Sequence, residues 1–85
     1  VDVIAADHVR WCGPAPAGRV DVGAQVRAHG EEVPATAEVL EGAQSPTLRV
    51  QLDQRVRGVA PGQSVVLYEG TRVVGSATIS ETGRA

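Results

Sequence analysis

The sequence predicts an all-β domain, a small antiparallel barrel of six to seven strands. Apolar and polar residues alternate with a period of two after residue 19, turn-forming residues separate the alternating segments, and no segment leaves room for a long helix. The chain has 85 residues, enough for one modest hydrophobic core. We therefore expect a single domain, with a lead-in strand and a Pro/Gly loop at 1–19, the barrel body at 20–82 and a tail at 83–85.

Three segments, 20–28, 47–53 and 71–79, have the alternation expected of strands with one buried face. Successive side chains of a strand point to opposite faces of the sheet, so one set should enter the core and the other should face outward. The residues expected inside are Val20, Val22, Ala24, Val26 and Ala28 in the first segment, Leu48, Val50 and Leu52 in the second, and Thr71, Val73, Gly75, Ala77 and Ile79 in the third.

The segment SVVLYE, residues 64–69, is apolar on both faces. Val65 and Leu67 share one face, and Val66 and Tyr68 share the other. Such a strand is expected to be covered twice, by the barrel core inside and by a neighbouring domain or a flanking loop outside.

Turn signals separate these segments. The stretches HGEE (29–32) and EGAQSP (41–46) are turn-like, and Glu69-Gly70 is expected to be a two-residue linker in which Gly takes a positive φ. The stretch WCGPAPAGR, residues 11–19, is expected to be a loop crossing between strand edges.

Pro61, Gly62 and Gln63 predict a structural turn that leads into the strand at 64–69. Pro fixes φ near −65° at the second position of a type II turn, and Gly accepts the positive φ of the third. Gln63 is then placed to tie the turn to an adjacent loop through its side-chain amide. A phosphate-binding loop is the weaker interpretation, because the stretch has one Gly and no following helix.

The composition offers little for catalysis or metal binding. Cys12 is the only cysteine, His8 and His29 are the only histidines, and their spacing is not typical of a metal site, so we expect no metal or cofactor in this segment. A Cys12–His nucleophile pair remains an open but weaker interpretation. A lone thiol fits a reducing, cytoplasmic setting, and no apolar run is long enough to span a membrane. The absence of Met and of an N-terminal signal leads us to expect a domain excised from a larger protein.

The basic residues allow two interpretations. All eight are Arg, against ten acidic residues, and the formal net charge of −2 argues against a free-standing nucleic-acid binder. One interpretation is a solvated barrel exterior; the other is a shallow basic strip that contacts RNA phosphates. The candidate residues for such contacts are Arg27, His29, Arg49, Arg55 and Arg57. Trp11 is expected to anchor the core or a seam, since RNA-stacking surfaces usually carry several aromatic residues.

The stretch VQLDQRVRGVAPGQSVVLYEGTRVVGSATI, residues 50–79, resembles the C-terminal barrel of the bacterial tRNA-specific 2-thiouridylases, and APGQSVVLYEG is its most specific part. The stretches HVRW and AQVRAHGEEVPATAEV extend the resemblance over nearly the whole chain. The family's older name is tRNA methyltransferase. The resemblance implies a barrel similar to domain 2 of translation elongation factors, which helps to hold tRNA and the enzyme's own central domain.

The resemblance further implies a parent enzyme that binds ATP and Mg²⁺ in an N-terminal domain, adenylates the wobble uridine of certain tRNAs and receives sulfur from a sulfur-carrier protein. None of those parts matches this chain, which is expected to be a non-catalytic accessory domain whose partners are tRNA and the parent's N-terminal and central domains. The alternatives are an elongation-factor-like or ribosome-maturation barrel that acts through protein contacts, and an independent small enzyme, for which no residue argues.

Overall fold

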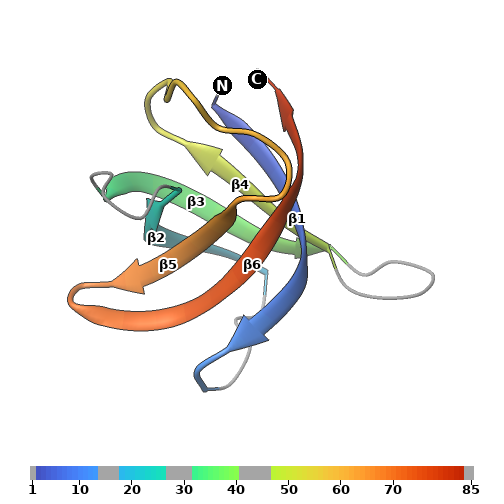
Figure 1. Ribbon diagram of the computed structural model, residues 1–85. Helices are drawn as coiled ribbons and strands as arrows, with labels where there is room; N and C mark the ends of the chain where they lie inside the picture. Colours follow the sequence, from blue (N-terminus) through green and yellow to red (C-terminus); the bar gives the residue numbers. More distant parts are fainter. Residues whose placement is uncertain (1, 14–17, 27–31, 41–46, 84–85) are drawn as a thin grey trace.

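The computed structural model describes residues 2–13, 18–26, 32–40 and 47–83, which form a closed antiparallel β-barrel (Figure 1). This architecture confirms the predicted all-β fold. Its strands are β1 (Val3–Trp11), β2 (Arg19–Gln25), β3 (Val33–Leu40), β4 (Thr47–Leu52), β5 (Ser64–Glu69) and β6 (Arg72–Gly83).

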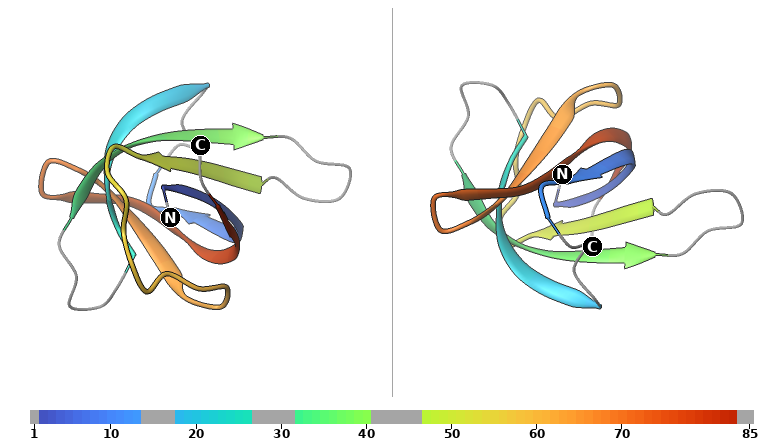
Figure 2. Two further views of the ribbon diagram at one scale, coloured as in Figure 1. Left: turned by 90° about the horizontal axis from the view of Figure 1, so that it is seen from above. Right: turned by 90° about the horizontal axis from the view of Figure 1, so that it is seen from below.

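The order of strands around the barrel is β1-β4-β3-β2-β5-β6, with β6 returning to β1, and every neighbouring pair is antiparallel. The segment before residue 20 therefore supplies a full barrel strand, because β1 pairs with both β4 and β6. Figure 2 shows the molecule from above and from below, with the strands arranged around a single interior. The described residues include no helix that is long and apolar enough to cross a membrane.

Alternate residues of the strands fill the barrel with light aliphatic side chains. The inward residues predicted for segments 20–28 and 47–53 are confirmed wherever they are described: Val20 is partly buried against the core, the others are buried, and Ala28 lies outside the described residues. Most of the side chains are short, so the interior is filled by many contributors from opposite walls. The buried residues are Ile4, Ala6, Val22, Ala24, Val26, Val33, Ala35, Ala37, Leu48, Val50, Leu52, Val65, Leu67, Ala77 and Ile79.

Strand β5 is covered on its outer face partly by its own neighbour. Val65 and Leu67 are fully buried in the core, whereas Val66 and Tyr68 on the outside are half-buried. The Tyr68 hydroxyl donates a hydrogen bond to Oε1 of Gln25 on β2, at 3.0 Å. This contact holds the polar end of Tyr68 against the neighbouring strand β2.

The alternation predicted for residues 71–79 is wrong at its beginning. Gly75, Ala77 and Ile79 do face inward, but Val73 is 39% exposed and Val74 packs against the core instead. The cause is a β-bulge: Leu67 pairs with Gly75 while Tyr68 pairs with Val73, so Val74 is an extra residue in β6. An inserted residue reverses which side chains point inward on the far side of the bulge.

A second bulge, in β1, has the same effect. Asp7 pairs with Thr78 and Arg10 with Ser76, which leaves one extra residue in β1, and His8 has a φ of 50°. A left-handed residue at this position is typical of bulges, although Gly usually occupies it. Inward residues before the bulge are Ile4 and Ala6; after it, Val9 and Trp11 pack against the core.

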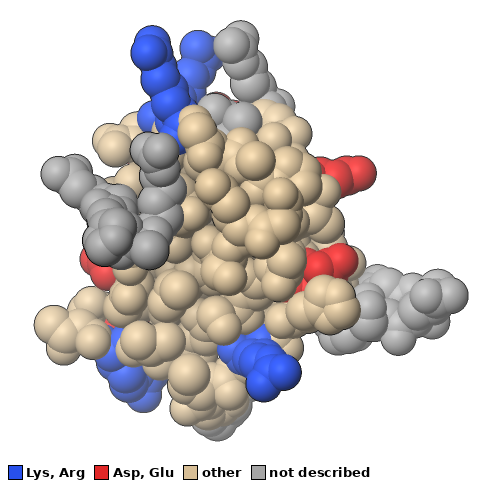
Figure 3. All heavy atoms as spheres, in the orientation of Figure 1, with Lys and Arg blue, Asp and Glu red and all other residues tan. Residues whose placement is uncertain are grey.

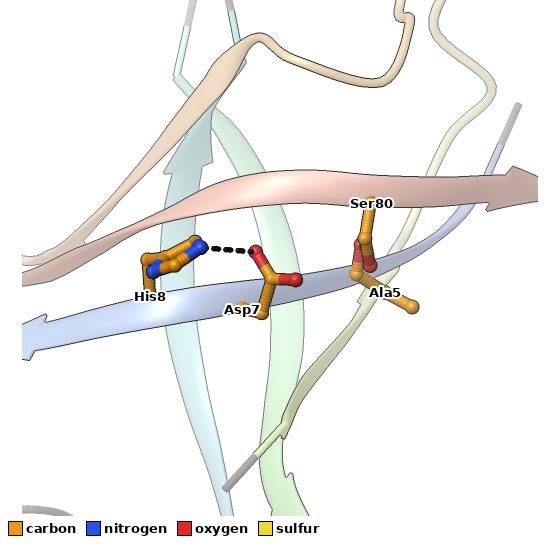
Figure 4. A network of polar contacts seen from close by, with 4 residues as sticks. All are labelled: Ala5, Asp7, His8 and Ser80. Atoms are coloured by element: carbon orange, nitrogen blue, oxygen red, sulfur yellow. Dashed lines mark hydrogen bonds and ion pairs between the residues drawn. The ribbon is translucent and has the colours of Figure 1, made fainter. Parts of the chain in front are cut away.

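Figure 4 shows Asp7 and His8 at the bulge of β1, with Ala5 and Ser80 nearby on β1 and β6. His8 projects from the barrel and its Nε2 lies 3.8 Å from Oδ1 of Asp7, a solvent-exposed contact of little energetic weight. Ser80 is the extra residue of a third bulge, between the pairs Ala5–Glu81 and Ala6–Ile79, and its hydroxyl donates to the Ala5 carbonyl at 3.1 Å. These irregularities allow β1 and β6 to bend around the barrel.

The connection from β4 to β5 packs Val56 and Val59 against the core and contains the Pro-Gly turn. Ala60–Gln63 has the geometry of a type II turn, with a φ of 94° at Gly62 and a hydrogen bond from the Gln63 N–H to the Ala60 carbonyl at 3.3 Å. The Gln63 side chain accepts from the Ala60 N–H at 3.1 Å, so it closes its own turn rather than reaching another loop. The turn is fixed to β6 by two backbone bonds, Gly62 N–H to the Ile79 carbonyl and Ile79 N–H to the Gln63 carbonyl.

The hairpin between β5 and β6 is shifted by one residue from the prediction. Glu69 pairs with Arg72 as part of the ladder, so the two-residue loop is Gly70-Thr71 and not Glu69-Gly70. Gly70 takes a φ of 65° at the first loop position, which is where a type II′ turn requires Gly. Glu69 can remain in the strand because the positive φ falls entirely on Gly70.

Candidate nucleic-acid interface

A polar groove lies on the outer wall of β2, β3 and β4. It has a volume of about 260 Å³ and is lined by Arg19, Thr36, Glu38, Arg49 and Gln51. Strand register explains how residues so distant in sequence meet: Arg19 pairs with Glu38, Glu38 with Arg49, and Thr36 with Gln51. The groove is thus built from two adjacent cross-strand rows of outward-pointing side chains.

The charges in this groove are two guanidinium groups separated by one carboxylate. An Arg19 Nη atom lies 3.8 Å from an Oε of Glu38, at the long limit of an ion pair, and the Arg19 side chain is 71% exposed. The side chain of Arg49, on the other side of Glu38, forms no hydrogen bond or ion pair with another described residue. Both guanidinium groups therefore keep donors available to a ligand.

The sequence-predicted contact residues are not gathered at one place. Arg49 lines the groove, whereas Arg55 and Arg57 are exposed in the connection that follows β4 and are not part of the lining. Arg27 and His29 lie outside the described residues. Figure 3 shows basic side chains at the upper and lower edges of the face on which β5, β6 and β1 are nearest the viewer, with a mostly uncharged surface between them.

Of the residues that line the groove, the sequence predicts Arg49 but not Arg19, Thr36, Glu38 or Gln51. The sequence predicts Arg19 at the end of the Pro/Gly loop, but it is the first residue of β2 and shares the outer face with Asp21. The signal was available, because Arg19 extends the polar set of the alternating segment by one more step. The pairing that brings Arg19, Glu38 and Arg49 into one row is not visible in any single segment.

Other reactive side chains of the described residues do not form a site. Cys12 is exposed at the end of β1, beside a small hollow of about 50 Å³ that Gly13, Arg72, Val73 and Val74 also line. No described histidine lines this hollow, so a Cys12–His8 pair is not assembled there. Within 2–13, 18–26, 32–40 and 47–83, no group of three or more His, Cys, Asp or Glu residues could hold a metal ion.

The closed antiparallel barrel defines a small all-β barrel domain, with a polar groove on its outer wall. A family model described as the aminomethyltransferase β-barrel domain matches residues 1–79. The chain is 55% identical over its full length to the tRNA-specific 2-thiouridylase MnmA of Streptomyces coelicolor, and 55% identical over 82 residues to that of Kineococcus radiotolerans. The chain therefore belongs to the aminomethyltransferase β-barrel domain family, in the form that constitutes the C-terminal domain of tRNA-specific 2-thiouridylases.

These relatives are much longer than the barrel. The chain covers 22% of the length of both the Streptomyces and the Kineococcus proteins, and 25% of the MnmA of Arthrobacter sp., to which it is 46% identical over 95 aligned residues. The similarity to each of them thus concerns a quarter of its length or less.

Proposed function

We propose that this barrel is the accessory, tRNA-contacting domain of an ATP-dependent tRNA wobble-uridine 2-thiolation enzyme, and that it carries no catalytic group itself. The observation that supports this most strongly is the 55% identity, over all 85 residues, to a protein named tRNA-specific 2-thiouridylase. The relatives named above carry the same name, which favours this function over an elongation-factor-like or ribosome-maturation module.

The division of labour within the parent enzyme is part of the proposal. ATP and Mg²⁺ would be bound, and sulfur received, by domains outside these 85 residues, in a cytoplasmic enzyme. The barrel would add phosphate contacts that hold the tRNA and a surface that holds the neighbouring domains. The described residues suit this role, since Arg19, Arg49, Arg55 and Arg57 are exposed and can reach phosphate groups.

A domain exchange tests the proposed function. The aligned segment of the Streptomyces coelicolor 2-thiouridylase is replaced by this chain, and a second version lacks the segment. The exchange is expected to keep the dissociation constant for tRNA within about threefold, whereas the deletion weakens it at least about tenfold, because phosphate contacts supply most of the affinity. Equilibrium binding and the 2-thiouridine content of the tRNA product give both readouts.

The same pair of proteins separates binding from catalysis. A domain that only holds tRNA should affect kcat/KM for tRNA far more than kcat measured at saturating tRNA. A deletion that left the tRNA affinity unchanged would contradict the proposed tRNA role. A deletion that abolished kcat with tRNA affinity intact would place a catalytic group in the barrel.

A further inference from the structure

We propose that the groove on the outer wall of β2, β3 and β4 binds a phosphodiester of the tRNA backbone, with Arg19 and Arg49 as the two phosphate ligands. This inference rests on the proposed function and names the surface that carries it out. The groove combines two exposed guanidinium groups with the hydroxyl of Thr36 and the amide of Gln51. Guanidinium groups bind phosphate oxygens through paired N–H donors, and hydroxyl and amide groups suit the ribose 2′-hydroxyl.

The row of outward side chains determines how the two Arg residues are spaced. Arg19, Glu38 and Arg49 are consecutive partners on β2, β3 and β4. Strands lie about 4.8 Å apart, so the Cα atoms of Arg19 and Arg49 are separated by roughly 10 Å. Long flexible side chains on either side of a groove can converge on one phosphate or hold two neighbouring phosphates.

Carboxylates limit the groove on two sides. The row that contains Arg49 continues through Ala5 on β1 to Glu81 on β6, and Asp21 on β2 pairs with Thr36. Negative charges at these positions repel phosphate, so the favourable path for RNA crosses β3 between the two Arg residues. Glu38 lies on that path, where its contact with Arg19 restrains the guanidinium group at the cost of some repulsion.

The opposite wall of the barrel is less suited to RNA. The outward side chains of β5 and β6 around the middle of that wall are Ser64, Val66, Ser76 and Thr78, and the face seen in Figure 3 is mostly uncharged between its edges. A neutral surface contributes little to the electrostatic attraction on which RNA binding depends. The charged groove is therefore the stronger candidate for the RNA contact.

Charge-changing variants in the exchanged enzyme test the groove. The double variant Arg19→Gln/Arg49→Gln is expected to weaken tRNA binding about tenfold and to reduce the slope of log K against log salt concentration by about 1.5, since each lost phosphate contact accounts for 0.7–0.9. The control for each single replacement is Arg72→Gln, which removes one positive charge, half of what the double variant removes, from a side chain of similar exposure (74%, against 71% for Arg19) that pairs with Glu69 on the β5–β6 hairpin. It should change the affinity less than about twofold.

Removing a negative charge from the groove should have the opposite effect on tRNA affinity. A purely structural role of the groove residues would not produce such a gain. Glu38→Gln removes the carboxylate from between the two guanidinium groups and is expected to tighten tRNA binding about twofold. Thermal unfolding of each variant verifies that the barrel remains folded.

The possible results distinguish the groove from the proposed function. If deletion of the barrel weakens tRNA binding but the double variant behaves like Arg72→Gln, the groove assignment is overturned and the proposed function stands. If the deletion has no effect on tRNA affinity, both fail. If the double variant leaves tRNA affinity unchanged but exposes the domain junction to limited proteolysis, the groove binds protein and not RNA.

Discussion

Replacing Gly75 with Ala is expected to lower the free energy of unfolding of this chain by about 3 kcal/mol, near the upper end of the usual range for an overpacked core position. Gly75 lies in β6 directly opposite Trp11 of β1. A Cβ atom at position 75 would lie 2.6 Å from Cε3 of the Trp11 ring and 2.7 Å from the backbone carbonyl oxygen of Arg10. Both distances are shorter than any real contact, and the carbonyl cannot move without disturbing the strand pairing.

Trp11, the single Trp of the chain, lies opposite Gly75 for a structural reason. The indole ring packs against the core and covers the backbone of Gly75, an arrangement that supports a strand where glycine provides no side chain. Urea unfolding of Gly75→Ala, with Gly83→Ala as the control in the same strand, measures the effect. Gly83 has no neighbouring atom within 4 Å of an added Cβ, so its substitution should cost less than about 1 kcal/mol.

A double variant tests the cause. Removal of the indole in Trp11→Ala should make Gly75→Ala less costly than it is alone, while the clash with the Arg10 carbonyl persists. Equal stability of Gly75→Ala and Gly83→Ala would show that the close packing of Trp11 on β6 is not present in solution.

Replacing Gly62 with Val is expected to lower the free energy of unfolding by about 2 kcal/mol through backbone strain alone. An added Cβ at Gly62 meets no atom within 4 Å, so steric overlap with a neighbour plays no part. The φ of 94° is unfavourable for a β-branched residue. The turn cannot relax freely, because the backbones of Gly62 and Gln63 are both hydrogen-bonded to Ile79.

Asparagine at position 62 provides a graded comparison. Asn tolerates positive φ at the third position of a type II turn, so Gly62→Asn should cost less than about 1 kcal/mol. Urea denaturation of both variants measures the difference. If Val and Asn were equally tolerated, the type II turn would not be the conformation of this segment in solution.

The sequence predicted the fold wherever strict alternation extends through a strand. In β2 and β4 every second residue is apolar, and Val22, Leu48 and Val50 are buried as that pattern requires. The bulges were not predicted, because no particular residue type marks an extra residue in a strand and only a change in the spacing of the apolar residues indicates it. In β1, the apolar residues Ile4, Ala6, Val9 and Trp11 have an interval of three in the middle, which is the signature of the bulge at His8.

The groove was only partly predictable for a different reason. Alternation assigns Arg49 to the outside of its strand, but it does not state which strands are neighbours. Arg19 and Arg49 meet across β3 because β4 returns between β1 and β3, a non-local arrangement. The predicted basic strip joins Arg49 on a strand face to Arg55 and Arg57 on the approach to the turn, yet the chain leaves the barrel wall at Asp53 and carries Arg55 and Arg57 into the connection.

Photochemical cross-linking of tRNA to the domain-exchanged enzyme, followed by mass spectrometry of the linked peptides, tests most directly whether this barrel contacts tRNA through the outer wall of β2, β3 and β4. We predict nucleotide adducts on peptides that contain Arg19–Gln25, Val33–Leu40 and Thr47–Leu52, and fewer adducts on those peptides in the Arg19→Gln/Arg49→Gln variant. Adducts confined to the β5–β6 hairpin, or to domains outside this chain, would contradict a tRNA contact through the outer wall of β2, β3 and β4.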